Sequence, residues 1–384
     1  MRKAARLCLS LNRRCVLRPE SNLGIVLIGI ALVFTAGPVF GNTSGGQAAV
    51  THTRVEVETL VRDLGGTSPP WWDSVELTYP ETLDVSWPLK ADGPWNARKN
   101  IGQYIWDVIN PNPGRWREGV KLVHHLMILN KDDSAKVCRS MNTLGRMFHD
   151  LLEDWPRAAF WWRMSAQRGG AYDPLGLAHC YWKMGNKSMA MEVLSQYRQD
   201  YTRHGAIIRL WAEMGEFDKA IKLADEKARF GAADVGYLAA GDVCRLRGEL
   251  QRGLAYYEKV LATPTANARE KDSEHNRERA KANIEAIKCF DALDLSRIPD
   301  GLYHAGSTAY AGPLYVEVAV KSNRIESVRI TEHKERQFYS AFTDTPKRII
   351  ERQSVKGIDV VSGATMTSEA IINATAKALA SGMK

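Results

Sequence analysis

The amino-acid sequence predicts a multidomain protein, with an all-α helical-repeat solenoid followed by a small α+β domain. Three observations support this prediction. A helix–turn–helix pattern marked by small residues recurs within residues 119–293. Apolar and polar residues then alternate over 314–320 with the period of a β-strand. A tight turn at Ser362-Gly363 leads into an apolar helix near the C-terminus. The length of 384 residues allows two or three domains with their own cores.

Residues 1–41 have the composition of an export sequence. Six basic residues and one acidic residue precede an uncharged run over 23–40, and small residues follow near its end. This order is typical of a secretory signal peptide, and the Gly and Pro that interrupt the run favour cleavage. An uncleaved membrane anchor through residues 21–41 is the alternative, because the run is about as long as a minimal span. Both interpretations predict an extracytoplasmic protein, periplasmic or in the cell envelope, since the basic flank stays inside.

The net charge of +8 is concentrated in this leader, whose six basic residues and one acidic residue leave +3 for the remainder. No basic stripe with interleaved aromatic residues follows, so we expect no nucleic-acid binding. Within the leader, residues 12–18 also resemble a twin-arginine export signal, although Asn12 replaces the usual Ser or Thr.

Residues 42–65 are polar and rich in Gly, Ser and Thr, which predicts a linker. Residues 66–118 hold seven of the 15 prolines and six of the 11 tryptophans. Alternating apolar residues on either side of Pro80 predict a hairpin over 75–87. Trp side chains on irregular loops can stack a flat ligand, but more often they close the end of an adjoining helical array. We therefore expect this segment to plug the array.

The repeat unit places Gly in the turn between two helices and a small residue five positions later. Three copies and one degenerate copy follow this rule: Gly185/Ala190, Gly215/Ala220, Gly248/Gly253 and Glu153/Ala158. Their intervals of 32, 30 and 33 residues are close to the tetratricopeptide period, and residues 178–185 and 210–220 resemble the first helix and turn of that family. Such a solenoid presents an extended concave surface. We expect it to dock a protein partner, with a simple spacer as the alternative.

The array ends at a charged amphipathic segment, residues 266–293. This segment is predicted to form a capping helix with Ile284, Ile287 and Phe290 on its apolar side. Cysteines beyond the leader are far apart, and we expect buried free thiols although export would permit disulfides: Cys138, Cys180, Cys244 and Cys289. Histidines of the array show no metal-ligand spacing and are interpreted as surface or core residues: His124, His125, His149 and His179. No metal site and no catalytic residue is predicted.

Residues 294–384 predict the α+β domain. Strands are expected over residues 301–306, 314–320 and 325–331. Asn323 lies where the hairpin turn between the last two strands needs φ > 0. Two helices are expected next. Thr345 would cap the first, with Pro346 in its first turn. A strand over 356–361 would lead into the second, over 368–379.

The most informative stretch, residues 359–368, is interpreted as the end of that strand, a tight turn and a helix that begins at Thr367 or Ser368. Gly363 can adopt φ > 0 and let another group approach the backbone closely. Thr365 places a hydroxyl beside a helix N-terminus, where unpaired N–H groups and the helix dipole favour a phosphate. A hydroxyl able to become a phosphoester therefore lies where a phosphate would be stabilised.

Five of these residues resemble the covalent-flavinylation motif of the FMN-binding domain family: Asp359, Ser362, Gly363, Ala364 and Thr365. That family includes the small flavoprotein subunit of the sodium-pumping NADH:quinone oxidoreductase. Residues 299–380 resemble the domain over nearly their whole length, including Glu332-His333-Lys334-Glu335, which matches an E-H-x-E run of the family. The resemblance implies that a flavin transferase, which uses FAD and a divalent metal, reads Asp359 and Ser362-Gly363-Ala364. It would join FMN through its phosphate to Thr365.

Five more residues are candidates by position. Tyr310, Gly312 and His333 would surround the flavin ring or simply pack the strands. Thr367 and Ser368 would bond the phosphate or cap the helix, and capping is favoured.

Together these features predict an exported electron-transfer flavoprotein, formally a phosphoprotein because FMN is attached through its phosphate. We expect an electron carrier rather than a stand-alone enzyme, since the cofactor supplies the redox chemistry. Its partners would be the flavin transferase and a redox protein or membrane electron-transfer complex. The alternatives are a flavin-dependent reductase, or its electron-feeding subunit, and a non-redox scaffold with a vestigial flavin domain.

Overall fold

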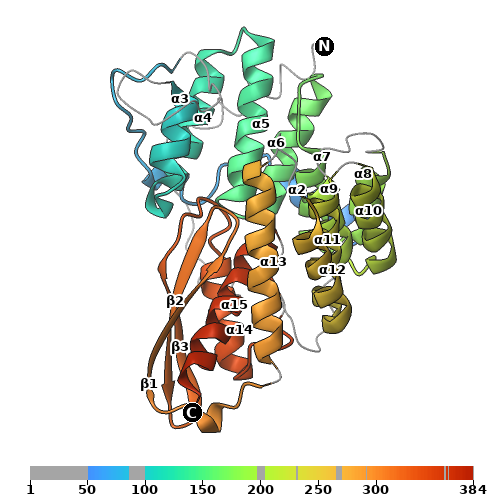
Figure 1. Ribbon diagram of the computed structural model, residues 1–384. Coiled ribbons are helices and arrows are strands. Elements are labelled where there is room, and N and C mark those ends of the chain that lie inside the picture. The colour runs from blue at the N-terminus through green and yellow to red at the C-terminus, as the bar shows by residue number, and fades with distance from the viewer. Residues whose placement is uncertain are drawn as a thin grey trace, which may run out of the picture. The chain divides into compact units, whose positions relative to one another are not determined.

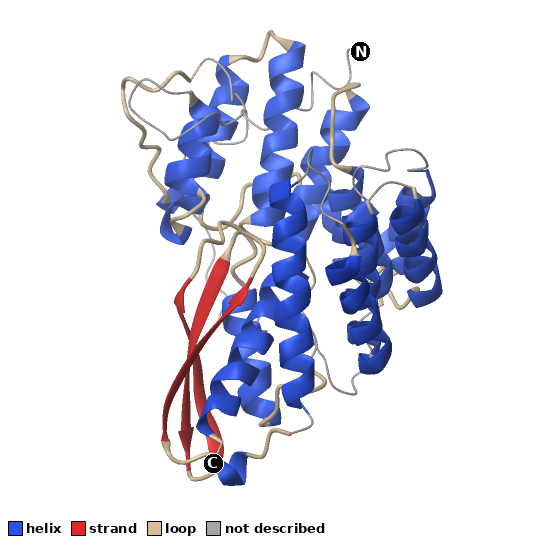
Figure 2. Ribbon diagram, viewed as in Figure 1, coloured by secondary structure: helices blue, strands red, loops and turns tan. Residues whose placement is uncertain are grey.

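The computed structural model describes residues 51–85, 100–196, 204–230, 232–264, 270–290, 292–358, 360–361 and 363–383. The predicted leader, residues 1–41, lies outside these ranges, as do Asp359 and Ser362 of the motif. No helix within the described ranges is long and apolar enough to cross a membrane. Figure 1 shows the arrangement of the elements, and Figure 2 shows that helices dominate, with the strands gathered in a single sheet.

A helix occupies much of the predicted linker. Helix α2 (Arg54–Asp63) begins with a capping box, in which Thr53 and Glu56 satisfy each other's backbone N–H groups. Val57 and Val61 follow one turn apart and are buried, and the helix packs against α6 (Trp155–Gln167). The linker prediction is therefore wrong over these residues, because the capping box and the apolar pair specify a docked helix.

The Trp/Pro-rich segment contains short helical pieces rather than a hairpin: η1 (Trp72–Ser74), α3 (Ile101–Tyr104), the π-helix η2 (Ile105–Ile109) and η3 (Pro113–Arg115). Leu83 N–H donates to the Pro80 carbonyl (2.9 Å), so the predicted turn exists. No strand flanks it within the described residues 75–85, and the hairpin prediction is wrong there. Trp71 and Trp72 pack against the helical core and Trp116 is buried, as the predicted plug requires.

Within the described residues, helix α4 (Trp116–Leu129) leads into four helix pairs, and the turn residue between the helices of each pair has positive φ. The pairs are α5 (Ser134–Asp150) with α6, α7 (Pro174–Lys183) with α8 (Lys187–Gln196), α9 (His204–Glu213) with α10 (Phe217–Arg229), and α11 (Ala233–Arg247) with α12 (Leu250–Ala262). The turn residue of each copy has positive φ, including Glu153 of the degenerate copy (51°). The small residue five positions later is buried in every pair. The predicted repeat unit is thus present in the structure.

Helix α13 (Glu270–Phe290) follows, and the predicted apolar side, Ile284, Ile287 and Phe290, is buried. The short helix η6 (Leu295–Arg297) then leads to the antiparallel sheet, in the order β1 (Gly301–Thr308), β2 (Pro313–Lys321) and β3 (Arg324–Glu332). Asn323 has φ 61° in the β2–β3 turn, as predicted. Alternate residues of β2 are fully buried under α15, and the others face outward.

The last two helices, α14 and α15, begin at earlier residues than the sequence predicted. Helix α14 (Ala341–Arg352) begins before the predicted cap Thr345, because Asp344 N–H already bonds the Ser340 carbonyl (2.8 Å). Pro346 therefore lies inside the helix, and Thr345 is not its cap. Helix α15 (Thr365–Gly382) begins at Thr365 rather than Thr367 or Ser368.

One hydrophobic core crosses the predicted boundary at residue 294. It joins Leu238 of α11, Tyr257 of α12 and Ile287 of α13 to Val316 of β2 and Ile371 of α15. Helix α13 packs on α12 and α15 and also touches β1. The large helical region and the small sheet-containing region are consequently packed together through α13 (Figure 1).

Candidate functional site

The segment before α15 is a loop, not the predicted strand. Among residues 354–358, 360 and 361 no strand is formed, and Val361 N–H donates to Ser368 Oγ (3.1 Å) instead of to a neighbouring strand. Val361 and Ile358 are buried. The apolar residues that suggested a strand therefore anchor a loop against the core.

Gly363 adopts the left-handed conformation that the sequence predicted, with φ 84°. A Cβ at this position would lie 3.0 Å from His179 Cε1 and 3.2 Å from Phe338 Cε1. His179 belongs to α7. Glycine is thus required both by the turn and by a side chain of the helical region that lies against it.

Thr365 is the first residue of α15 and is 6% exposed. Its Oγ1 donates a hydrogen bond to Glu213 Oε1 of α9 (2.9 Å). The preceding residue, Ala364, has no side-chain capping bond, so the opening N–H groups of α15 lack a side-chain cap there. The predicted hydroxyl at an available helix N-terminus is therefore present, and it faces a carboxylate of the helical region.

Thr367 and Ser368 do not cap α15, so the favoured capping interpretation is wrong. Ser368 instead holds the loop through Val361 N–H, as described above. Thr367 is buried and forms a side-chain hydrogen bond with Glu335, whose pKa is raised by burial and partly lowered by hydrogen bonds from Ala311, Tyr310 and Thr367. Because the helix begins earlier than expected, both residues lie inside its first turn.

A cavity of about 530 Å³ lies between the motif and the helical region. One wall is formed by Gly363 to Thr367 of the motif, together with Tyr310, Glu335 and Phe338. Most of the remaining lining residues come from the helical region: His149, Asp150, Asp173, Leu175, Gly176, His179, Gly205, Ala206, Arg209, Leu210, Glu213 and Val235. Thr365 thus opens onto a chamber that both parts of the chain build.

Of the three residues predicted by position to surround a flavin ring, only Tyr310 lies at the cavity. Tyr310 lines the cavity and is 54% exposed. Gly312 has φ 137° in the β1–β2 turn, where its carbonyl accepts from Ala309 N–H (2.8 Å). His333 packs against Phe342, with ring centroids 4.3 Å apart, and burial lowers its pKa. Neither Gly312 nor His333 is part of the cavity lining: Gly312 serves the turn, and His333 packs against the aromatic residues Tyr339 and Phe342.

Arg209 and Glu213 bring opposite charges to the cavity from one face of α9. They are four residues apart, one helical turn, and both belong to the part of the lining that the helical region contributes. Burial lowers the pKa of Arg209, as does the nearby guanidinium of Arg279, while Asp242 and Glu213 oppose this shift. Sequence reasoning missed both residues, because nothing within α9 marks them as neighbours of a motif about 150 positions away.

His149 and His179, interpreted from sequence as surface or core histidines, are both buried at the cavity. His149 Nε2 lies 2.8 Å from His179 Nδ1, and His149 Nδ1 lies 2.6 Å from Asp150 Oδ1. The two histidines are separated by 30 residues. This spacing is close to one repeat, so the stacking of successive helix pairs brings them together. Their spacing was the one signal that sequence reasoning could have used.

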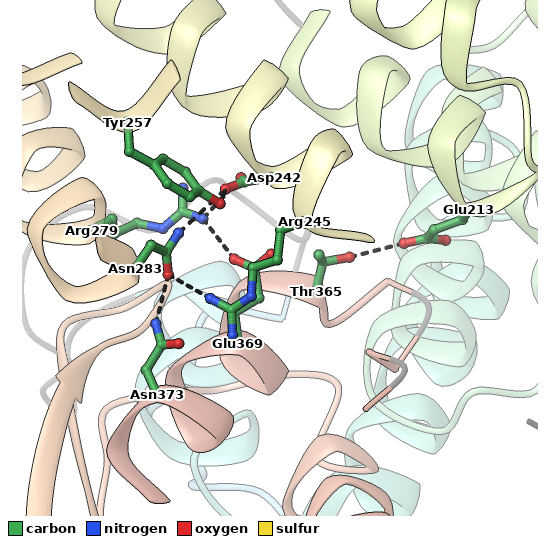
Figure 3. Close-up of polar contacts among 9 residues, drawn as sticks. All are labelled: Glu213, Asp242, Arg245, Tyr257, Arg279, Asn283, Thr365, Glu369 and Asn373. Carbon is green, nitrogen blue, oxygen red and sulfur yellow. Dashed lines mark hydrogen bonds and ion pairs between the residues drawn. The ribbon is translucent and has the colours of Figure 1, made fainter. Parts of the chain in front are cut away.

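Behind Thr365, a buried polar network joins α15 to the helices α11–α13 (Figure 3). Arg279 lies 3.1 Å from Asp242 and 3.4 Å from Glu369, all three nearly inaccessible to solvent. Tyr257 donates to Asp242 (2.9 Å), and Asn373 donates to Asn283 (2.6 Å). Burial and the Asp242 charge raise the pKa of Glu369 to about 7, against the opposing effect of the arginines. Glu369, one turn after Thr365, thus ties the start of α15 to the helical region.

Comparison with known proteins identifies the C-terminal part. Residues 309–380 match the FMN-binding domain family. An uncharacterized protein of Treponema pallidum (strain Nichols) is 37% identical over 103 residues. The matched region covers 26% of this chain and 26% of the length of that relative. No solved structure matches significantly. The protein therefore carries an FMN-binding domain at its C-terminus, preceded by a large helical region.

Proposed function

We propose that this protein is an exported electron-transfer flavoprotein whose FMN is joined through its phosphate to Thr365. The observation that carries the proposal is the position of Thr365. Its hydroxyl stands at the uncapped start of an 18-residue helix and at the wall of a cavity of about 530 Å³. A helix N-terminus favours a phosphate, and the cavity has the size of small-molecule sites, roughly 300–1,000 Å³.

The residues around Thr365 fit a phosphoester and a flavin ring. The first N–H groups of α15 and the Arg209 guanidinium would supply donors and positive charge for the remaining phosphate charge. Esterification removes the Thr365 proton that bonds Glu213, so the Glu213 carboxylate would have to turn away from the phosphate. Phe338 and Tyr310 line the same cavity and offer aromatic surface for a ring. FMN supplies the electron-accepting chemistry, whereas these side chains hold it, orient it and limit access of water.

The proposal also names partners. Thr365 is 6% exposed and bonded to Glu213, so a flavin transferase, using FAD and a divalent metal, acts before these contacts form or on an opened chain. Asp359 and Ser362, with Gly363 and Ala364, are the residues it would read. A redox protein or membrane electron-transfer complex would exchange electrons with the flavin, with the helix pairs, as a tetratricopeptide-like solenoid, providing its docking surface.

One observation favours a second candidate, a flavin-dependent reductase for a small substrate. The cavity contains the hydrogen-bonded histidine pair, and histidines are the side chains that most often exchange protons with a reacting substrate. Substrate-dependent reoxidation of the flavin, in the absence of any protein acceptor, distinguishes this candidate from the carrier.

The attachment is tested by producing the mature chain together with the transferase and mapping its peptides by mass. We expect the mass of FMN on the peptide that contains Thr365, and its complete loss in Thr365→Ala because the acceptor oxygen is gone. Thr367→Ala is the matched control, since Thr367 is also a buried hydroxyl of the first turn, and it should retain the flavin. Attachment that persists in Thr365→Ala contradicts the proposal.

A further inference from the structure

One carboxylate oxygen on α9 holds the motif at two points. Thr365 Oγ1 donates to Glu213 Oε1 (2.9 Å), and the Gly363 N–H donates to the same oxygen over a longer distance (3.5 Å). Glu213 is the last residue of α9. Figure 3 shows Glu213 meeting Thr365 apart from the buried network around Arg279. We call this pair of contacts the Glu213 latch.

Attachment of FMN, as proposed above, removes the hydrogen atom on which the shorter contact depends. A bond forms between Thr365 Oγ1 and a phosphorus atom of FAD, the pyrophosphate bond of FAD breaks, AMP leaves, and the hydroxyl proton passes to water. Oγ1 then belongs to a phosphodiester with one negative charge, and it has no proton to donate. The Glu213 latch therefore loses its shorter hydrogen bond.

The same step places two negative charges side by side. Phosphorus is bonded to the atom that lies 2.9 Å from Glu213 Oε1, so the phosphate oxygens and the carboxylate become close neighbours. Thr365 is buried and Glu213 is half-buried at the cavity, so water and salt screen the repulsion only in part. A contact that attracts before attachment consequently repels after it.

The motif itself has little room to relieve this repulsion. A Cβ on Gly363 would already lie 3.0 Å from His179 and 3.2 Å from Phe338. Ser368 Oγ anchors the loop that precedes the turn. Glu213, in contrast, is a half-buried side chain at the end of a helix, so it has more freedom to turn. Relief of the repulsion is therefore expected from the Glu213 side chain.

Two cations flank Glu213 and determine where it can turn. Arg209 lies one turn earlier on α9, and Lys183 lies at the end of α7. Burial lowers the pKa of both side chains, and the Glu213 carboxylate opposes this shift in each of them. A phosphate on Thr365 would compensate the charge of Arg209, which lines the same cavity. Lys183 is then the cation towards which Glu213 can turn.

We propose that the Glu213 latch responds to flavin attachment, an inference that rests on the proposed esterification of Thr365. While the hydroxyl is free, Glu213 holds the motif against α9. Once the phosphoester forms, Glu213 turns towards Lys183, and Arg209 faces the phosphate. The helical region therefore has two arrangements at α9, one for the flavin-free chain and one for the flavin-carrying chain. Because the latch also engages the hydroxyl, it has to open before a transferase can modify Thr365.

The latch is tested on the full mature chain in two forms, one made without the transferase and one carrying FMN on the Thr365 peptide, as verified by mass. Urea midpoints of wild type and Glu213→Gln are measured for both forms. Glutamine keeps an accepting oxygen but has no charge. In the flavin-free form we expect the midpoint to fall by about 0.5 M, because a hydrogen bond to a charged acceptor is stronger. In the flavin-carrying form we expect the midpoint to rise, because the repulsion is gone.

Glu216→Gln is the matched control. Glu216 has the same charge three residues later, but it pairs with Lys187 and Lys219 (2.7 Å each) and lies outside the cavity lining. Its midpoint shift should be the same in both forms. If Glu213→Gln does not fold, Glu213→Ala provides the measurement. It removes both the hydrogen bond and the charge, so it should lower the midpoint of the flavin-free form and raise that of the flavin-carrying form.

Equal midpoint shifts of the Glu213 variant in the two forms would show that Glu213 does not respond to attachment. The latch is then wrong, and the attachment stands. A wild-type chain that acquires no FMN on the Thr365 peptide overturns the attachment and the latch together.

Discussion

Gly363 and Thr365 show what local sequence can specify at the scale of single residues. The positive φ of Gly363 and the hydroxyl near the helix start follow from covalent geometry and helix electrostatics, and both were predicted. The contacts of Glu213 with Thr365 and of His179 with Gly363 were not predicted. Their role comes from tertiary packing between segments about 150 or more residues apart, and local sequence patterns carry no information on such pairs.

Replacing Gly363 by Ala should destabilise the protein more than replacing Gly357 by Ala. Both glycines have positive φ, 84° and 68°, so each alanine carries a backbone cost of roughly 1–2 kcal/mol. Only the Cβ at 363 also meets His179 and Phe338 at 3.0 and 3.2 Å. At 357 the nearest atom is the end of the Arg352 side chain, at 3.7 Å.

Urea denaturation of both variants checks this prediction. We expect Gly363→Ala to lose at least about 1 kcal/mol more unfolding free energy than Gly357→Ala, within the range of overpacking costs. Equal losses would show that His179 and Phe338 do not confine the motif.

At the scale of elements, periodic patterns predicted helices and strands correctly, whereas a short apolar run predicted a strand that the structure does not contain in its described part. The alternation of β2 and the Gly turns of the helix pairs are in the structure, because repeated local signals reinforce one another. Over the described part of 356–361 no strand forms, since Ser368 Oγ satisfies the Val361 N–H that a strand partner would have bonded. The early start of α14 was missed for a similar reason: Ser340 accepts from Asp344 through its backbone carbonyl, which carries no sequence signal.

The contact between α13 and α15 should respond to pH through Glu369. Burial and the Asp242 charge raise the folded-state pKa of Glu369 from 4.5 to about 7. Between these values the folded chain binds more protons than the unfolded chain, so this group makes stability fall as pH rises from about 4.5 to about 7 and has no further effect above that range. Glu369→Gln keeps an acceptor for Arg279 but cannot ionise, so it should remove this loss.

Urea midpoints between pH 5 and 8 measure the effect. The stability of Glu369→Gln relative to wild type should increase with pH up to about 7. Glu285→Gln is the control, because Glu285 also links α13 to α15, through Lys377 (2.8 Å), but is more than half exposed. Parallel wild-type and Glu369→Gln curves would show that Glu369 titrates normally.

At the scale of the whole molecule, the order of regions was predictable but their mutual packing was not. Composition and periodicity separated a helical region from an α+β domain, and the domain matches over residues 309–380. The pattern did not reveal that one apolar core passes from α11 through α13 to α15, or that α7 and α9 form a wall of the cavity. These contacts are within the chain, so partner docking on the remaining helical surface and the alternative of a simple spacer both stay predictions.

The shared core limits where the C-terminal domain can be cut without losing its fold. Residues 294–384 alone lack α13, whose Ile284, Ile287 and Phe290 are at most 8% exposed in the intact protein. Burying such side chains contributes about 1.5–3 kcal/mol each. Three of them therefore approach the whole stability of a typical domain, about 5–15 kcal/mol. We expect residues 294–384 to show no cooperative urea transition by circular dichroism, and residues 270–384 to recover one. If both fragments unfold at the same midpoint, the small domain is self-sufficient and α13 belongs to the helical region alone.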